Sequence, residues 1–269
     1  MTKEFPDAYD IQRWTPQGLP QILGCTSIIN TLHELSESGG RFPNLMICGE
    51  PGTGKTAAIN AFRKTLNCPH RSGNPASACG TCDDCHKFDV RYDLTGFYAV
   101  GLERVAKFNA IPLHHYTINC GDANESLFRE LFKDRRDFQG NMVVFLDECQ
   151  RLVRRSLDEM LLLPLEQANI SWVAATARPE ELDPMFIRRF ALRLKTTPPT
   201  ATELATFLAD RCREWKIKVD DTKTLVTLAQ SSQCRPSECF CVLSTATITP
   251  NRLLTIKMVE DHPFLPTSS

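Results

Sequence analysis

Short apolar runs alternate with stretches of helical periodicity through the first two thirds of the chain. Four runs predict strands, at residues 44–48, 115–119, 142–146 and 171–175. The run at 142–146 has no polar alternation, which is typical of a strand buried on both faces of a parallel sheet. Helical spacing over 55–66 and 157–165 separates the strands. This alternation predicts an α/β fold, with a parallel sheet flanked by helices.

The pattern changes at the linker that contains Pro198 and Pro199. Helical apolar spacing without strand signals follows it, over residues 202–215, 222–230 and 237–245. We therefore predict a first domain over residues 1–196 and a small α-helical domain over 197–258. Loop-forming residues at 68–86 predict an insertion within the first domain. Residues 259–269, which contain Pro and Ser, are expected to form a disordered tail.

The composition is that of a soluble globular protein. Of the 269 residues, 42% are hydrophobic and 23% are charged, which excludes a collagen, a coiled coil and a disordered chain. The 31 basic and 32 acidic residues give a net charge of −1, so any contact with DNA has to come from a local basic patch. The N-terminus lacks a secretory pattern, and no apolar run approaches the roughly 20 residues that cross a bilayer. We expect a cytoplasmic protein without membrane contact.

A phosphate-binding loop is predicted between the first strand and the first helix. Residues 49–56 match the pattern G-x-x-x-x-G-K-S/T in full. Such a loop turns backbone N–H groups toward phosphate oxygens, and the next helix directs its positive end at them. Lys55 is expected to neutralise the β- and γ-phosphates, and Thr56 to place its hydroxyl on Mg²⁺. The other residues expected to bind the nucleotide are Glu50, Pro51, Gly52, Thr53 and Gly54.

Two acidic residues follow the apolar run at 142–146. Acids at the end of a buried strand are costly unless they meet a cation. We expect Asp147 to hold the Mg²⁺, directly or through water, and Glu148 to orient and polarise the attacking water. The alternative is a solvated acidic pair, and the phosphate loop upstream argues against it.

The 12 cysteines include one cluster with metal-ligand spacing. Without an export signal, clustered cysteines indicate a metal rather than disulfides. The cluster is Cys68, Cys79, Cys82 and Cys85, whose C-x2-C turns suit a closed tetrahedral shell. Structural Zn²⁺ is favoured, with an iron–sulfur site and unliganded thiols as alternatives and with His70 and His86 as alternative ligands. The scattered cysteines are expected to be small buried apolar side chains: Cys25, Cys48, Cys120 and Cys212.

The two nucleotide motifs and the helical C-terminal part resemble AAA+ ATPases, and shorter segments resemble the clamp-loader branch of that family. These segments are Arg13–Pro16, Gln21–Gly24, Asn119–Asp122, Leu157–Glu166, Ala175–Pro184 and Phe186–Phe190. Asn119–Asp122 is similar to a stretch of replication factor C subunits, and the cysteine cluster resembles the zinc module of the bacterial clamp-loader tau/gamma subunit. The resemblance covers about residues 10 to 245.

The resemblance implies an ATPase that uses ATP and Mg²⁺ and consists of a P-loop AAA+ domain and a helical lid. It further implies that the opening segments help to enclose adenine, that Arg189 reaches the γ-phosphate of a neighbouring subunit, and that Arg235 serves the nucleotide from the lid. Solvated surface arginines are the alternative for Arg188 and Arg189. The implied partners are other AAA+ subunits in a homo- or hetero-oligomer, DNA, and a sliding clamp or another protein.

Two departures from the family pattern put fast hydrolysis in question. Ala177 stands where the family carries a polar sensor residue, and alanine cannot hydrogen-bond a phosphate or a water. Thr176 could substitute for it after a register shift. In the lid, Ser237 aligns with the sensor arginine, and Arg235 lies just before it.

Two functions of different classes are compatible with these motifs. The first is an ATPase that assembles and remodels DNA or loads a clamp. The second is a slow or inactive ATP-dependent oligomeric switch that recruits partners on DNA, as in transposition regulators and antiviral-defence assemblies. An unfoldase is less favoured because no Gly-flanked aromatic pore loop is present. The clamp-loading function is also weakened, because only a short tail follows Thr245 where family members carry a collar domain.

Basic residues that could contact DNA cluster in the central part of the chain. They are Arg129, Lys133, Arg135, Arg136, Arg151, Arg154 and Arg155. Several phosphate contacts would make binding steeply dependent on salt. The alternative is a set of solvated helical faces balanced by Asp134, Asp137 and Asp158. Residues 87–115 form an additional segment, whose Phe97, Tyr98 and Phe108 predict packing only.

Overall fold

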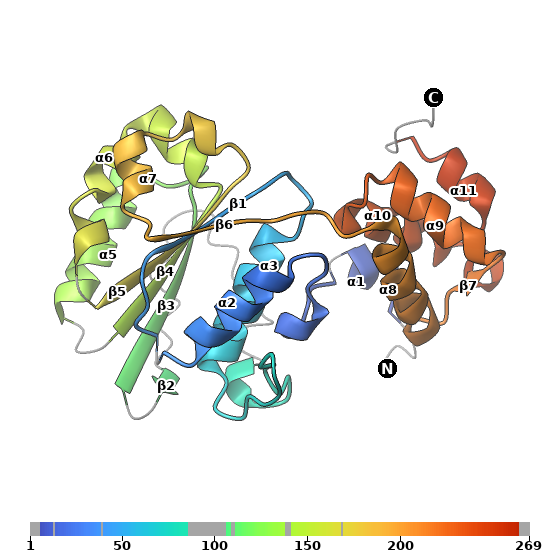
Figure 1. Ribbon diagram of the computed structural model, residues 1–269, viewed down its shortest axis with the longest axis horizontal. Coiled ribbons are helices and arrows are strands. Elements are labelled where there is room, and N and C mark those ends of the chain that lie inside the picture. The colour runs from blue at the N-terminus through green and yellow to red at the C-terminus, as the bar shows by residue number, and fades with distance from the viewer. Residues whose placement is uncertain are drawn as a thin grey trace.

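A twisted sheet with helices on both faces and a separate group of helices make up the protein (Figure 1). The computed structural model describes residues 6–12, 14–38, 40–85, 106–108, 111–137, 141–167 and 169–263. The predictions for Phe97, Tyr98, His86 and Arg13 lie outside these residues. Within them, no helix combines the length and the apolar character that crossing a bilayer requires.

The sheet has six strands in the order β2-β3-β4-β5-β1-β6. The strands are β1 (Leu45–Cys48), β2 (Ala106–Phe108), β3 (Ile111–Asn119), β4 (Asn141–Asp147), β5 (Ile170–Thr176) and β6 (Leu192–Lys195). All neighbours are parallel except β2, which pairs antiparallel with β3. The register pairs Asn119 with Asp147, and Cys48 with Thr176. The carboxyl ends of four strands therefore meet at one edge, where the phosphate loop begins.

Helices cover both faces of the sheet, and strand β4 shows how the sequence specifies this. Val143 and Phe145 point into the core beneath α2 (Thr26–Ser36) and α3 (Lys55–Asn67). Val144 and Leu146 point into the opposite core. That core lies beneath α5 (Glu125–Asp137), α6 (Leu157–Leu161) and α7 (Pro184–Arg188), as Figure 1 shows. Successive side chains of a strand alternate between faces, so a strand covered on both sides is apolar throughout.

The parallel α/β fold and its four predicted strands are confirmed, whereas two local predictions need correction. The helix expected over 157–165 ends at Leu161, and a 3-10 turn, η4 (Pro164–Glu166), follows. Pro164 lacks the N–H that a continued helix needs, which explains the break. Strand β6 has no counterpart in the prediction, because its alternating residues are only partly buried and two of its four are basic.

The helical region after residue 196 contains the three predicted helices. Its elements are α8 (Ala201–Glu214), β7 (Lys218–Val219), α9 (Thr222–Ser231), α10 (Pro236–Ala246), η6 (Pro250–Arg252), β8 (Leu253–Leu254) and α11 (Ile256–Glu260). Thr200 and Glu203 form a reciprocal capping box that fixes the start of α8. The two-residue strands β7 and β8 pair in parallel, and strands this short leave no periodic signal in the sequence.

The N-terminal segment packs on this helical region. Helix α1 (Ala8–Gln12) lies against α10, and its Ile11 is fully buried in the same core (Figure 1). Trp14 contributes an edge-to-face contact with Phe207 at 5.6 Å and a tilted contact with Phe240 at 5.3 Å. The predicted division at residue 197 therefore separates segments that share one core. Helix α11 continues to Glu260, and residues 264–269 lie outside the described part.

Candidate functional site

The phosphate loop joins the carboxyl end of β1 to the first residue of α3. Gly52 and Gly54 have φ angles of +79° and +85°, which L-residues with side chains rarely adopt. Gly49 has a φ of +151°, which side chains rarely allow, and a Cβ there would lie 3.2 Å from both Cβ and the carbonyl oxygen of Thr196, just after β6, as well as 1.9 Å from its hydroxyl. The hydroxyls of Thr53 and Thr196 lie 2.7 Å apart in a hydrogen bond that ties the loop to the neighbouring strand. The loop is thus held from both sides.

Lys55 lies inside the loop that precedes it. Its Nζ donates hydrogen bonds of 2.7 Å to the carbonyl oxygens of Gly49 and Glu50. Burial lowers the pKa of Lys55, and the nearby carboxylate of Asp147 opposes that shift. When a phosphate enters the loop, the Lys55 ammonium group can replace its two neutral carbonyl partners with anionic phosphate oxygens, which form stronger hydrogen bonds.

Thr56 and Asp147 bring a hydroxyl and a carboxylate together from different elements. Oγ1 of Thr56, on the first turn of α3, donates to the two carboxylate oxygens of Asp147 at 3.2 and 3.3 Å. Burial raises the pKa of Asp147, and the hydrogen bond from Thr56 opposes the shift. A half-buried carboxylate beside a hydroxyl is a donor set that suits a hard divalent cation. These residues therefore fit Mg²⁺, as the sequence predicts.

Glu148 occupies a constrained position directly after Asp147. Its backbone is left-handed, with φ 53° and ψ 47°, and its carboxylate forms an ion pair with Arg151. The Arg151 side chain lies against Gly121, where a Cβ would be 2.8 Å from its guanidinium. The turn at Asn119–Asp122, predicted from resemblance, is thus in contact with the acidic motif.

Thr176 does not take the place of the missing polar sensor in this structure. Its hydroxyl is buried and donates to Oε1 of Gln150 at 2.8 Å, while accepting from the backbone N–H of Arg178. Gln150, which we did not single out in the sequence, therefore engages this hydroxyl in a buried hydrogen bond. Ala177 follows as the first residue after β5.

The lid region meets the phosphate loop at the start of α10. Arg235 caps this helix and forms a 2.9 Å ion pair with Glu50 of the loop. A Cβ on Gly52 would lie 2.8 Å from Oγ of Ser237. Both residues that the lid could use as a sensor are thus adjacent to the loop, although more than 180 residues separate them from it in the sequence.

Arg189 lies at the opposite end of the strands from the phosphate loop. Its guanidinium forms an ion pair with Glu166, and its carbonyl accepts from the side-chain amide of Asn44, which precedes β1. The loop follows the other end of β1. Arg189 and the exposed Arg188 therefore do not reach the phosphate loop of their own chain.

The four cysteines of the insertion converge on one point. Their Sγ atoms all lie within 4.8 Å of one another, with Cys68–Cys82 at 4.0 Å and Cys79–Cys85 at 3.9 Å. Four thiolates at about 2.3 Å from a tetrahedral Zn²⁺ would be separated by about 3.8 Å. Hydrogen bonds from Thr81 lower the pKa of Cys79, whereas burial raises the pKa of Cys68 and of Cys85, so the convergence of the four Sγ atoms rather than their acidity indicates the metal. The donor set fits structural zinc.

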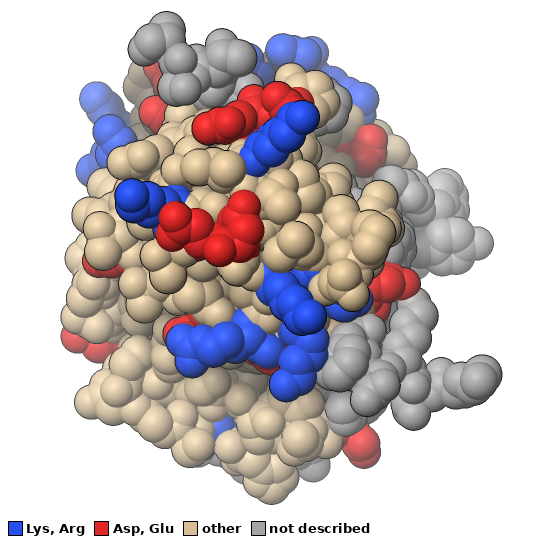
Figure 2. Space-filling view, turned by 90° about the vertical axis from the view of Figure 1, so that its right-hand side faces the viewer, with Lys and Arg blue, Asp and Glu red and all other residues tan. Residues whose placement is uncertain are grey.

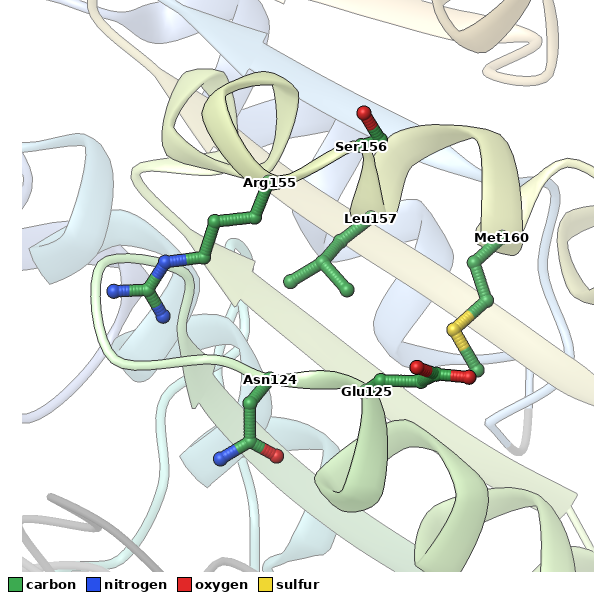
Figure 3. Close-up of a pocket in the computed structure, with 6 residues that line it drawn as sticks. All are labelled: Asn124, Glu125, Arg155, Ser156, Leu157 and Met160. Atoms are coloured by element: carbon green, nitrogen blue, oxygen red, sulfur yellow. The ribbon is translucent and has the colours of Figure 1, made fainter.

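Basic side chains and a shallow pocket adjoin the acidic motif. Arg129 pairs with Glu125, Arg155 donates to the carbonyl of Ala123, and Arg154 is exposed. The pocket, of about 360 Å³, lies between the start of α5 and the 3-10 segment η3 (Cys149–Arg155) with α6 (Figure 3). Its lining residues are Asn124, Glu125, Arg155, Ser156, Leu157 and Met160.

Charge is distributed in small groups over the described surface. The side chains of Lys133, Asp134, Arg135, Arg136 and Asp137 lie outside the described part, and Asp158 is buried rather than solvated. On the lid-side face, groups of basic and acidic side chains alternate with wide uncharged areas (Figure 2). Among described residues, the basic candidates for DNA contact are therefore those next to the acidic motif, outside the lid.

Comparison with known proteins places these features among nucleotide-dependent proteins. Residues 45–197 match the family described as "ATPase family associated with various cellular activities (AAA)". The chain is 26% identical over 226 residues to DNA polymerase III subunit tau/gamma of Haemophilus influenzae, covering 82% of this chain and 30% of that protein. It is 28% identical over 123 residues to an ORC1-type DNA replication protein of Methanoculleus marisnigri, covering 44% of this chain and 27% of that protein. The chain thus spans less than a third of the length of these relatives.

Solved structures support the fold. The RuvB Holliday junction branch migration motor of Thermotoga maritima superposes with a TM-score of 0.54 at 14% identity, covering 93% of this chain and 71% of that one. A mutant of the same RuvB gives a TM-score of 0.59 at 15% identity, covering 91% and 71%. At this level of identity the likeness concerns the fold alone.

We predict that the cysteine cluster binds one zinc ion and that Cys82→Ser releases it, because the closed shell loses a thiolate. The variant is expected to unfold at least about 5 °C lower than the parent, since zinc binding contributes to folding. Metal analysis and thermal unfolding measure both effects. Cys234→Ser, at a half-buried cysteine of the lid, is the matched control and should keep its zinc. Full zinc content in Cys82→Ser, or iron in the parent, would contradict the assignment.

Proposed function

This chain belongs to the AAA family of ATPases, and we propose that it binds ATP with Mg²⁺ at the phosphate loop and hydrolyses it within an oligomer that acts on DNA in a clamp-loader-like manner. The observation that carries the proposal is the convergence of Lys55, Thr56 and Asp147 at the carboxyl edge of the sheet. Ligands of open α/β sheets bind at this edge. The cysteine cluster would hold zinc as a structural element.

The residues around the loop take distinct roles in this proposal. The backbone N–H groups of residues 50–56 hold the phosphates, and Lys55 exchanges its carbonyl partners for phosphate oxygens. Glu148 orients the attacking water, for which it has to leave the ion pair with Arg151. Arg235 contacts the nucleotide from the lid after release from Glu50. Mg²⁺, when bound, neutralises the charge of the transferred phosphoryl group.

The position of Arg189 supports assembly. Because Arg189 lies at the far end of the strands from its own loop, the role proposed for it requires a nucleotide on a neighbouring subunit. A cation supplied in trans completes charge neutralisation and couples hydrolysis to oligomerisation. The proposed partners are therefore other AAA subunits, of the same or a different chain.

Action on DNA is proposed from the relatives and from the basic residues near the acidic motif. Two relatives are named as a DNA polymerase subunit and a DNA replication protein. In this chain Arg151 contacts Glu148, and the exposed Arg154 lies three residues further along η3. DNA phosphates binding there would lie close to the hydrolytic acid. A sliding clamp or another protein is the proposed second partner.

A slow or inactive ATP-dependent switch is the alternative function, and one observation favours it. The hydroxyl of Thr176 is committed to Gln150, and Ala177 offers no polar group. Positions 176 and 177 therefore offer no uncommitted hydroxyl that could assist Glu148 in positioning water against the γ-phosphate. ATP binding without turnover, in the presence or absence of DNA, would support the switch.

Lys55→Ala and Glu148→Gln are expected to separate binding from hydrolysis. Lys55→Ala removes the cation from the loop and should weaken ATP binding by about 10-fold or more. Glu148→Gln keeps the loop intact, so it should bind ATP normally but hydrolyse it about 100-fold more slowly. Calorimetry and phosphate release measure the two properties, with Glu159→Gln on the exposed side of α6 as the control. Normal turnover by Glu148→Gln would refute the role of Glu148.

Mixing two inactive variants tests the proposed role of Arg189. Arg189→Ala keeps Glu148, and Glu148→Gln keeps Arg189, so a mixed oligomer contains complete sites at some interfaces. Each variant alone is expected to lose most phosphate release, and an equimolar mixture should recover about a quarter of the parent rate. If the mixture stays at the level of the separate variants, or if Arg189→Ala is fully active, the trans assignment is wrong.

Charge reversal at Arg154 tests the DNA surface. Arg154→Glu is expected to weaken DNA binding by about 10-fold at moderate salt, because one favourable phosphate contact becomes repulsive. The salt dependence of binding should also become less steep by about one unit. Fluorescence anisotropy with a DNA oligonucleotide measures both, and Lys223→Glu on the lid is the matched control. Equal losses in the two variants would point to net charge alone.

A further inference from the structure

The cysteine cluster anchors a short hairpin that makes specific contacts outside the insertion. Ser72 and Ser77 exchange two backbone hydrogen bonds, of 3.1 and 2.8 Å, which close the hairpin between Cys68 and Cys79. Arg71, in the same hairpin, forms an ion pair with Glu37 at the end of α2. The backbone N–H of the buried Ala76 donates to Nδ1 of His33 on α2 at 3.1 Å. The hairpin is therefore fixed to the first domain as well as to the cysteines.

The tightest of these contacts is made with the segment Gln17–Gln21. Gly18 and Ser77 form an antiparallel β-bridge, and a Cβ on Gly18 would lie 2.0 Å from Oγ, 2.8 Å from Cβ and 3.1 Å from Cα of Ser77. Rotating the Ser77 hydroxyl would remove only the first of these clashes. Gly18 has an extended backbone that any residue can adopt, so the position requires glycine for space alone. The module and this segment are in direct backbone contact.

The same segment also contacts the helix that begins at the phosphate loop. The side-chain oxygen of Gln17 accepts from Nζ of Lys64, which is buried on α3. Leu19 is fully buried in the core that α3 shares with the sheet. Helix α3 carries Lys55 and Thr56 at its first turn. The segment Gln17–Gln21 thus contacts both the cysteine module and α3, the helix that presents the phosphate-binding residues and that ends directly before Cys68.

Just after the segment Gln17–Gln21, Gly24 and Cys25 make close contacts with the residues that follow β6 and adjoin the phosphate loop. A Cβ on Gly24 would lie 2.7 Å from the backbone of Pro199. The Sγ of Cys25 accepts a hydrogen bond from the backbone N–H of Thr197 at 3.4 Å and donates one to the carbonyl oxygen of Thr197 at 3.3 Å. The preceding residue, Thr196, holds Thr53 of the loop and lies where a Cβ on Gly49 would clash. Gly18, Gly24 and Gly49 therefore each allow a close approach on the path from the cysteine module to the phosphate loop.

From these contacts we propose that the cysteine module is a positioning element for the nucleotide site, so that metal occupancy sets the affinity for ATP. When the four thiolates bind one ion, the hairpin is held against Gly18. The segment that contains Gly18 contacts α3, and Gly24 and Cys25 just after it contact residues 197–199. When the module loosens, the segment loses its outer support and the loop loses its fixed geometry. This inference rests on the proposed function, because it assumes that the loop binds ATP. Gly18 acts here as the positioning residue, through its close approach to the backbone of the hairpin at Ser77.

Gly18→Ala tests this coupling without altering a cysteine. Its Cβ pushes the hairpin away from the segment, so ATP should bind about 3- to 30-fold more weakly while the zinc content stays at that of the parent. Ser77→Gly alone leaves both parameters unchanged, and the double variant G18A/S77G should recover most of the affinity, since only the 3.1 Å approach to the backbone remains. ATP titration by calorimetry, metal analysis and circular dichroism provide the measurements.

Parent protein from which zinc has been removed with a chelator should show a loss of affinity at least as large as that of Gly18→Ala. Should Gly18→Ala fail to fold, Arg71→Ala, which breaks the pair with Glu37 at the surface, replaces it with an expected two- to threefold loss. Folded, zinc-loaded variants that bind ATP as tightly as the parent would overturn the inference. If the zinc-loaded parent itself binds no ATP, the proposed function fails instead.

Discussion

The phosphate loop depends on a single steric constraint at the end of the central strand β1. This strand pairs with β5 on one side and β6 on the other, so the loop that leaves it has to bend within the space between their ends. Glycine at position 49, with a φ of +151°, accommodates the approach of Thr196, and the hydrogen bond between the Thr196 and Thr53 hydroxyls then fixes the curl. The other residues of the site lie around this curl. Lys55 bonds carbonyls of the loop, Thr56 lies beside Asp147, and Arg235 pairs with Glu50 of the loop.

The charged groups assigned to the nucleotide are each matched within the chain. Lys55 bonds loop carbonyls, Arg235 pairs with Glu50, Glu148 with Arg151, and Arg189 with Glu166. Half-exposed pairs of this kind contribute little stability, so exchanging them for phosphate oxygens costs little. In the proposed function, triphosphate binding would release Arg235 from Glu50 and so couple the nucleotide to the lid, and Arg189 would couple subunit contact to hydrolysis. The proposed effect of the cysteine module on the phosphate loop would be a third connection.

The sequence was most informative where the backbone conformation, the charge or the metal ligation at a position can be supplied by very few residue types. Glycines 49 and 54, Lys55, Thr56 and the apolar run before Asp147 predicted the loop, the strand and their meeting, because local pattern and chemistry agree there. The cysteine spacing predicted convergence for the same reason. Strand β6 and the role of Gln150 were missed, since partial burial and a single long-range hydrogen bond leave no periodic signal. The packing of Trp14 on the lid could not be predicted from the sequence either, because it joins residues about 200 positions apart.

In the proposed function, a triphosphate lies in the phosphate loop with its metal at Thr56 and Asp147. Crystals grown with Mn²⁺ and a non-hydrolysable ATP analogue, measured at a wavelength where manganese scatters anomalously, test it most directly. We expect one anomalous peak beside the Thr56 hydroxyl, with the β- and γ-phosphates in the loop and the carboxylate of Asp147 in direct or water-mediated contact. A nucleotide bound elsewhere on the chain, or a manganese peak away from these two residues, would contradict it.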